Sequence, residues 1–136
     1  MTSYLSFSAN RNEDHLISIL IDMLDENHFS VSTNHSLAPP KSMRFVNIFI
    51  GLVAASNQES NIKVLEQWQS ARKERVPSLL LVDKKTLKTI PEDFLKEADG
   101  TPIKNIIPFN KSKPMEELKL VKEKINQASY QFENVW

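Results

Sequence analysis

Two apolar runs constrain the fold of this chain more than any other feature. Residues 45–53 read FVNIFIGLV and residues 76–82 read VPSLLLV, and neither run contains a charged side chain. Runs of this length that are rich in Val, Ile and Leu are typical of parallel strands buried on both faces of a sheet. Since such a sheet must be covered by helices on both sides, the two runs predict an α/β protein.

The segments around these runs alternate between strand and helix patterns. Further strands are predicted over residues 4–8, 29–31 and 103–109. Helices are predicted from a capping pattern at Asn10 to about residue 27, over 61–75, over 91–98, and from Ser112 onward. This order predicts a flavodoxin-like three-layer fold, in which helices cover both faces of a central, mainly parallel, five-stranded sheet.

The composition excludes several classes of protein. A chain of 136 residues predicts a single domain over 1–136. It has no Cys, which excludes disulfides, Cys-ligated metals and a thiol nucleophile, and its three His lack metal-ligand spacing. Its two Gly, Gly51 and Gly100, cannot form a GxGxxG or Walker A loop. The 17 basic and 17 acidic side chains balance, which argues against a nucleic-acid partner.

The chain also lacks the marks of a membrane or secreted protein. No apolar run approaches the roughly 18 residues that a membrane span needs. The first residues, MTSYLSFS, have neither a basic region nor a long apolar core of the kind found in signal peptides. We therefore expect a cytoplasmic protein with no membrane partner.

Three features of the sequence resemble a Toll/interleukin-1 receptor (TIR) domain over nearly the whole chain. Residues 4–8, YLSFS, resemble the first strand of that family, and residues 45–53 followed by Ala-Ala-Ser56 resemble its third strand and trailing Ser. Residues 60–66, SNIKVLE, resemble the family pattern Ser-x-Trp-Cys-x-x-Glu, and Pro77 opens the following strand as in the family. Ser60 and Glu66 match this pattern.

Two departures from the family pattern have consequences. Ile62 and Lys63 replace the family's Trp and Cys, so an aromatic wall for a ligand is missing at Ile62. Residues 33–44 are too few for the family's usual loop plus second helix, so we expect that helix to be shortened or missing.

The resemblance implies cleavage of NAD, as substrate, at the bond between nicotinamide and ribose, with Glu66 as the catalytic carboxylate and no further cofactor. Ordinary glycosides need an acid to protonate the leaving oxygen and a second carboxylate opposite it. Nicotinamide is a cationic ring that leaves neutral, so one carboxylate that stabilises the oxocarbenium-like ribose is sufficient. Water gives ADP-ribose, and attack by the adenine ring of the same molecule gives a cyclic isomer.

Ligands of open parallel sheets bind beyond the carboxyl ends of the strands, which places the other candidate residues. Ser8, Asn10 and Arg11 precede a helix N-terminus that favours the pyrophosphate, or else they are a cap and a surface Arg. Phe7 flanks the ligand or belongs to the core. The remaining candidates come from the family's mobile loop and from the segment after the third strand, and they are Pro39, Ser56 and Ile62.

The resemblance leaves other functions open. TIR domains also act as non-catalytic adaptors that assemble with one another, and the missing Trp at Ile62 favours that alternative. A nucleoside deoxyribosyltransferase-like enzyme is a third reading, since it shares the strand–helix order and a Glu directed at ribose. For the enzyme, the family implies TIR–TIR assembly or a homo-oligomer. It also implies a role in antiphage defence, in which a separate effector reads the nucleotide signal.

Overall fold

The computed structural model describes residues 1–8, 14–35, 43–55, 57–110 and 115–133. Five parallel strands form one sheet in the order β2-β1-β3-β4-β5, which confirms the predicted flavodoxin-like fold with a five-stranded parallel sheet. The strands are β1 (Thr2–Phe7), β2 (Ser30–Thr33), β3 (Ile48–Val53), β4 (Ser78–Asp83) and β5 (Ile106–Phe109).

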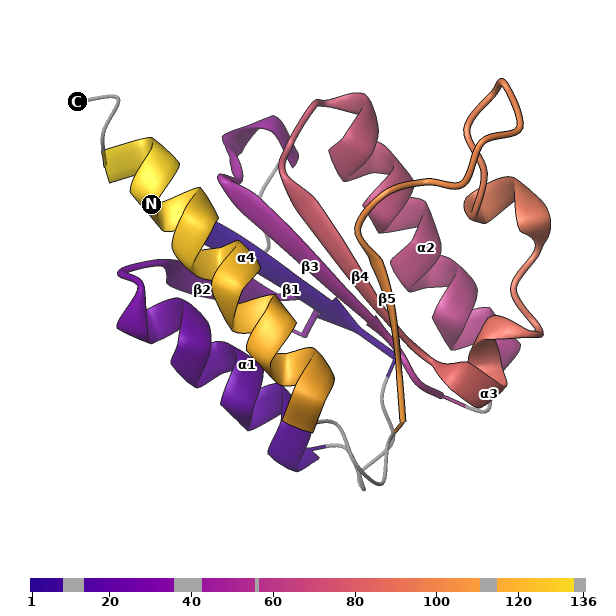
Figure 1. Ribbon diagram of the computed structural model, residues 1–136, viewed down its shortest axis with the longest axis horizontal. Helices are drawn as coiled ribbons and strands as arrows, with labels where there is room; N and C mark the ends of the chain where they lie inside the picture. Colours follow the sequence, from indigo (N-terminus) through magenta and orange to yellow (C-terminus); the bar gives the residue numbers. More distant parts are fainter. Residues whose placement is uncertain (9–13, 36–42, 56, 111–114, 134–136) are drawn as a thin grey trace.

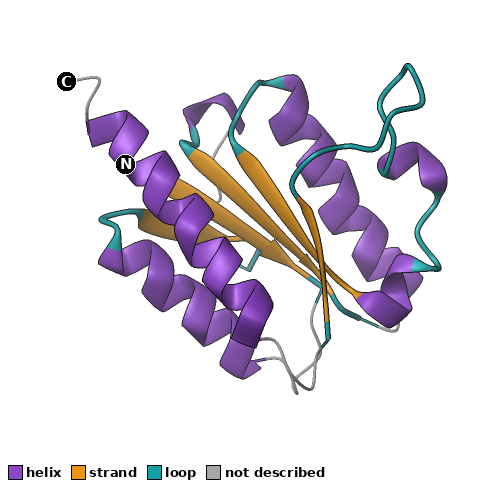
Figure 2. Cartoon of the chain, in the orientation of Figure 1, coloured by secondary structure: helices purple, strands orange, loops and turns teal. Residues whose placement is uncertain are grey.

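Helices cover both faces of this sheet (Figures 1 and 2). The helices α1 (Asp14–Glu26) and α4 (Met115–Glu133) lie on one face, and α2 (Gln58–Lys73) lies on the other face with the short α3 (Lys84–Leu87) beside it. Two 3₁₀ turns, η2 (Met43–Phe45) and η3 (Glu92–Phe94), complete the described elements.

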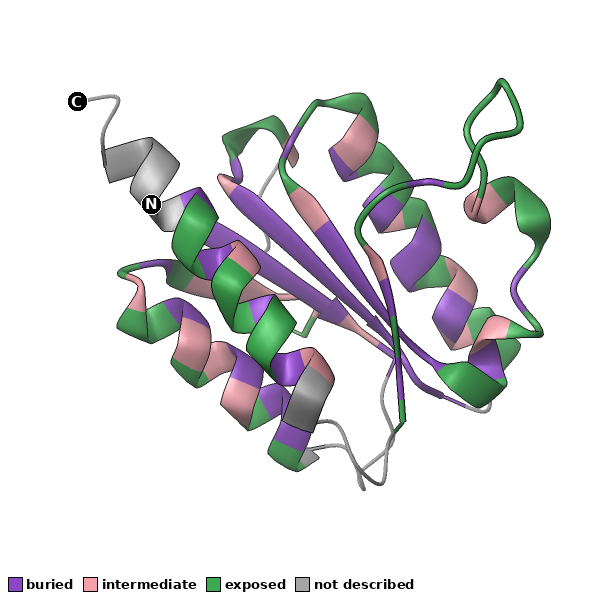
Figure 3. Cartoon of the chain, in the orientation of Figure 1, coloured by how far each residue is buried: buried purple, intermediate pink, exposed green. Residues whose placement is uncertain are grey.

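The sheet separates two apolar cores, and its central strands are buried on both faces (Figure 3). All six residues of β3 are buried, which confirms the interpretation of the first apolar run. One core lies under α1 and α4, and the other lies under α2, where Trp68 is fully buried. Trp68 is therefore a core residue.

Gly51 allows α2 to pack closely on the sheet. A Cβ atom at this position would lie 2.8 Å from Leu80 Cδ1 and 3.3 Å from Val64 Cγ1. Because Gly51 faces α2 from the middle of β3, its missing side chain lets a helix approach at van der Waals distance.

The two outer strands of the sheet, β2 and β5, differ from its central strands. The edge strand β2 has four residues, and in its register Ser32 pairs with Tyr4 of β1, so both lie on the α2 side of the sheet. Between β2 and β3, only η2 is helical among the described residues, which agrees with the expected shortening of the second helix. The other edge strand, β5, carries Pro108, a residue that sheets confine to their edges.

Several predicted boundaries were wrong. The helix predicted over 91–98 is only the 3₁₀ turn Glu92–Phe94, followed by a bridge between Lys96 and Pro102, because the short segment has few apolar positions to bury. The helix α3 was not predicted. Residues 45–47 and 103–105 precede the strands to which they were assigned, since β3 begins at Ile48 and β5 at Ile106.

No described helix has the length and apolar content required to cross a membrane. The predicted starts of the first and last helices, at Asn10 and Ser112, lie outside the described residues.

Candidate functional site

The carboxyl ends of the strands form one edge of the sheet, which we call the carboxyl edge, and a buried hydrogen-bond cluster holds it together. Ser8, just after β1, donates from Oγ to Asn61 Oδ1 on α2 at 2.5 Å. Asn61 also donates from Nδ2 to the Ala55 carbonyl at 2.9 Å and accepts from the Ala55 N–H at 3.3 Å. The Ala54 N–H donates to Ser8 Oγ at 3.3 Å. The cluster therefore joins the ends of β1 and β3 to the first turns of α2.

A second polar link joins α2 to β1. Gln67 accepts a hydrogen bond from the Ser6 hydroxyl through Oε1 and donates from Nε2 to the Tyr4 hydroxyl at 3.2 Å. Ser6 and Tyr4 are both buried. Burial raises the pKa of the Tyr4 phenol above its ordinary value, and the hydrogen bond from Gln67 lowers that pKa by less.

The side chains at the end of β1 and β2 form a rim that is partly exposed. Asn34 accepts from the Phe7 N–H at 3.2 Å and donates to the Phe7 carbonyl at 2.9 Å, so its amide continues the ladder between the two strands. The rings of Phe7 and His35 lie 4.8 Å apart between centroids and are tilted by 40°. Phe7 thus contacts both the core and the rim. The sequence had left open whether Phe7 belongs to the core or flanks a ligand.

Glu66 lies on the solvent side of α2. The residues two positions before and after it, Val64 and Trp68, are buried against the sheet. Because an α-helix turns by about 100° per residue, a residue two positions away points to the opposite side. Glu66 is accordingly exposed, and it makes no ion pair or hydrogen bond with the described residues.

The stripe of α2 that contains Glu66 faces away from β1. Gln58, Ile62 and Glu66 follow one another at four-residue spacing, and Gln58 Nε2 donates to the Thr89 carbonyl beyond α3 at 3.4 Å. Gln67, on a different side of the helix, contacts β1. Ser8 contacts α2 through Asn61, and no hydrogen bond among the described residues joins Ser8 to Glu66. The buried positions of α2 also begin with Asn61 and include Val64, whereas Ile62, assigned to the apolar stripe, is half-buried.

The other candidate residues divide into two groups. Ser8 is 7% exposed, and its hydroxyl is engaged in the internal cluster with Asn61. Four candidates lie outside the described residues, and they are Asn10, Arg11, Pro39 and Ser56. Phe7 and Ser8 lie together at the end of β1, whereas Ile62 and Glu66 lie on α2.

Asp83 is a buried carboxylate at the carboxyl edge that sequence reasoning missed. It is the last residue of β4, it is 5% exposed, and Thr86 Oγ1 donates to its Oδ2 at 3.4 Å. An Asp directly after a buried LLLV run is a signal that could have identified it, because ligands of parallel sheets gather where strands end.

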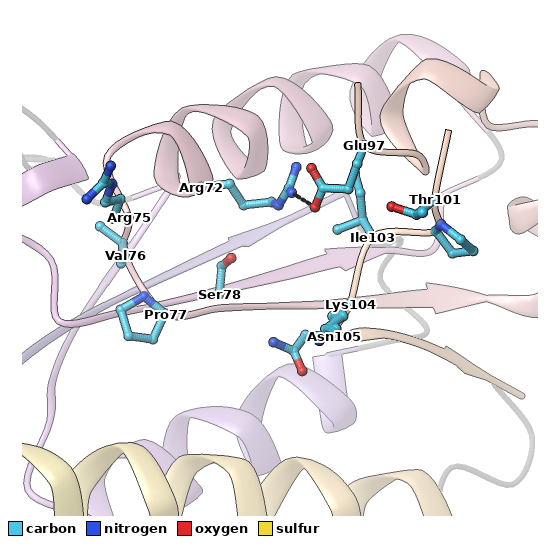
Figure 4. Close-up of a pocket in the computed structure, with 11 residues that line it drawn as sticks. Arg72, Arg75, Val76, Pro77, Ser78, Glu97, Thr101, Ile103, Lys104 and Asn105 are labelled. Carbon is cyan, nitrogen blue, oxygen red and sulfur yellow. Dashed lines mark hydrogen bonds and ion pairs between the residues drawn. The ribbon is translucent and has the colours of Figure 1, made fainter. Parts of the chain in front are cut away.

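Two clefts formed by described residues lie at the opposite edge, where the strands begin, and we call this the amino edge. The larger of the two, about 550 Å³, is lined by residues from the end of α2, the start of β4 and the segment before β5 (Figure 4). A smaller cleft of about 190 Å³ adjoins it toward α4, and a third lies against residues 92–100. None of these three clefts includes Glu66.

No protein-family model and no curated protein matches this chain. Among solved structures, it is similar to a probable GTP-binding protein engB, with a TM-score of 0.50 and 16% identity over 93% of this chain and 99% of that one. It is also similar to the Fusobacterium nucleatum flavodoxin bound to flavin mononucleotide, with a TM-score of 0.41 and 7% identity over 99% of this chain and 98% of that one.

The likeness to the GTP-binding protein concerns the fold alone. In this chain the segment that follows β1, residues 8–13, reads SANRNE and contains no glycine, so a Walker A loop is absent there. The resemblance to TIR domains therefore rests on the sequence motifs.

Proposed function

We propose that the chain is a TIR-type domain that cleaves NAD at the nicotinamide–ribose bond, with Glu66 as the carboxylate that acts on the ribose. The observation that carries the proposal is the motif match of residues 60–66, which falls on α2 immediately after β3. The carboxylate of Glu66 is exposed and unpaired among the described residues, so it remains available to a ligand.

The chemistry needs one carboxylate and no protonation of the leaving group. The bond between ribose C1′ and the nicotinamide nitrogen breaks, and its electron pair leaves with nicotinamide, which becomes neutral. Glu66 holds a ribose hydroxyl and stabilises the positive charge that develops on the ribose. Water then adds to C1′ and releases a proton, which gives ADP-ribose. Attack by the adenine ring instead gives a cyclic isomer.

The position of Glu66 on the outer stripe of α2 implies a requirement for assembly. An exposed carboxylate is surrounded by water, in which its electrostatic effect on a ribosyl cation is weak. A second copy that packs over this stripe would exclude water and complete the pocket. We therefore propose that the enzyme acts as a homo-oligomer or TIR–TIR assembly in the cytoplasm, and that its product serves as a signal in antiphage defence to a separate effector.

The test is turnover of NAD by the pure protein over a range of protein concentrations, with products separated by chromatography and identified by mass. We expect free nicotinamide together with ADP-ribose or its cyclic isomer, and a specific activity that rises with protein concentration. Glu66→Gln should abolish turnover. Glu59→Gln is the matched control, because Glu59 is an exposed acid on the same helix. Turnover that survives Glu66→Gln would contradict the assignment of Glu66.

The second candidate function is a non-catalytic interaction module. The exposed position of Glu66, outside the three clefts, favours it, as does Phe45, whose side chain is 62% exposed with Arg44 stacked on its ring. Self-association that depends on concentration, without nicotinamide release at any concentration, would support this module and refute the enzyme.

A further inference from the structure

Two neighbouring clefts lie along the amino edge of the sheet, one toward α2 and one toward α4. The cleft of about 550 Å³ and its neighbour of about 190 Å³ share three lining residues, Pro77, Ser78 and Asn105. The first extends toward the end of α2 and the second toward α4. The volume of the larger cleft is within the usual range of pockets that hold small molecules, about 300–1,000 Å³. We call this combined space the amino-edge groove.

The amino-edge groove is rich in positive charge in a chain whose charges balance. Arg72, Arg75 and Lys104 line its larger part, and Lys124 lines its smaller part. The only carboxylate among its described lining residues is Glu97. The whole chain has 17 basic and 17 acidic side chains, so this excess is local. A local excess of cations attracts an anionic ligand.

Two contacts fix the guanidinium group of Arg72 at the groove. Its Nη2 lies 2.5 Å from Glu97 Oε1, and its Cζ lies 5.3 Å from the centre of the Trp68 ring. Figure 4 shows Arg72 reaching across to Glu97, with the Ser78 hydroxyl directed toward the same space. Since Glu97 neutralises Arg72, this pair shapes the groove rather than supplying its excess charge.

The excess charge comes from Arg75, Lys104 and Lys124. Neither Arg75 nor Lys104 has a carboxylate partner within ion-pairing distance among the described residues. Lys124 Nζ donates to Asn105 Oδ1 at 3.2 Å, a neutral partner that leaves its charge uncompensated. The negative end of the α2 dipole is also at this edge, but Arg72 and Lys73 of its last turn offset that dipole.

The wall of the groove also offers apolar surface. Val76, Pro77 and Ile103 line it beside the cations. We propose that the amino-edge groove binds a small molecule that carries a phosphate group next to an apolar or aromatic body, such as a nucleoside monophosphate. The cationic side chains that line the groove pair with the phosphate, since guanidinium and ammonium groups form charge-assisted hydrogen bonds with it. The body of the ligand lies against the Pro77 side.

This binding site is separate from the proposed NAD chemistry, and its test does not use turnover. Isothermal titration calorimetry of the whole chain with AMP should give a dissociation constant below about 1 mM that weakens as salt is added. Adenosine and inorganic phosphate, titrated singly, should each bind at least about tenfold more weakly, because each supplies only half of the recognition.

The variants that test the cations keep the backbone intact. Arg75 has a positive φ of 60°, and Asn tolerates that conformation, so Arg75→Asn removes the charge without new strain. Arg75→Asn and Lys104→Gln should each weaken AMP binding by at least about threefold, and together by at least about tenfold. Lys63→Gln is the matched control, because Lys63 is exposed on α2 but does not line the groove.

Three outcomes would overturn the proposal. These are no binding of AMP, equal binding of adenosine, and full affinity in the Arg75→Asn/Lys104→Gln double variant when its folding is shown by unchanged circular dichroism. Binding of an acidic peptide in place of AMP would assign the groove to a protein partner instead. Loss of NAD turnover in Glu66→Gln, with AMP binding retained, would show that the two sites are independent.

Discussion

The carboxyl and amino edges of the sheet use polar groups in opposite ways. At the carboxyl edge, Ser8 and Asn61 are neutral, buried, and bonded to each other and to the backbone. At the amino edge, Arg75 and Lys104 are charged, exposed, and without ion-pair partners among the described residues. The first arrangement fixes one helix to two strands. The second leaves charge available to something outside the chain.

This difference limits a rule of fold topology. Parallel sheets bind ligands beyond the carboxyl ends of their strands, and that rule directed attention to the segments after Ser8 and Val53. Ser8 and Asn61 there are used in internal hydrogen bonds, while two clefts formed by described residues lie at the other edge. The fold topology predicts where a ligand binds. A side chain at that place is available to the ligand only if it is not already hydrogen-bonded within the protein.

The largest expected effect concerns the buried cluster at the carboxyl edge. Asn61→Ala should lower the free energy of unfolding by about 2–4 kcal/mol, because the Ser8 hydroxyl and both backbone groups of Ala55 lose their partner inside the protein. Urea denaturation measures this loss in the free energy of unfolding. Asn57→Ala, which removes only the exposed cap of α2, should cost about 1 kcal/mol. Equal losses in the two variants would show that the cluster contributes no more than an ordinary cap.

The close approach of α2 to the sheet, between the two edges, gives the next effect. Gly51→Ala should cost about 1–3 kcal/mol, because the new methyl group overlaps Leu80 Cδ1. The Cδ1 atom is the far end of the Leu80 side chain, so the shorter side chain in Leu80→Val should relieve the overlap. A double-mutant cycle from urea denaturation should then show coupling between the two positions. Strict additivity would mean that another contact limits the approach of α2.

The substitution Arg75→Gly at the amino edge should raise the stability of the fold while it weakens the proposed binding of AMP. Arg75 ends α2 in the left-handed conformation, and the Val76 N–H donates to the Ala71 carbonyl at 2.9 Å. Glycine is favoured at this position, so Arg75→Gly should stabilise the fold by about 0.5–1 kcal/mol and weaken AMP binding. His28, with a φ of 66°, ends α1 in the same way. His28→Gly should therefore stabilise the fold without affecting AMP, and a loss of AMP binding there would contradict the location of the groove.

The smallest effect is a pH dependence from Tyr4. Burial raises the pKa of Tyr4 in the folded protein above its ordinary value of 10.0, so the neutral phenol is favoured by folding. Its contribution to stability is complete below the ordinary pKa and is lost as the pH rises through the raised value. Thermal unfolding of Tyr4→Phe and the unmodified chain should differ by a constant amount at neutral pH, and the unmodified chain should lose more stability above about pH 10. Parallel curves at high pH would contradict a raised pKa.

The fold could be predicted from the sequence because its strongest signals are local. The runs at 45–53 and 76–82 are typical of buried strands, and the structure places β3 and β4 there. Trp68 could be assigned to the core because its spacing placed it on the apolar side of α2. The helix predicted over 91–98 was wrong because its helical pattern is short and nothing in the sequence reveals what it packs against.

The burial of Asn61 on α2 could not be predicted from the apolar pattern. Asn61 is 3% exposed, since Ser8 and Ala55 satisfy its amide, but a hydrophobic pattern does not count an Asn as buried. The apolar spacing selects Ile62 instead, which is half-buried, together with Leu65 and Trp68, which are buried. The amino-edge groove was equally hidden, because its residues come from three segments that only the fold brings together.

The two edge strands bear on how copies of this protein can associate. The strand β2 has only four residues, and β5 carries Pro108, which has no N–H to donate. Short edge strands and prolines discourage one sheet from extending into another, which is the usual route to open-ended aggregation. Any assembly of this chain should therefore proceed through helix surfaces and loops rather than through its edge strands.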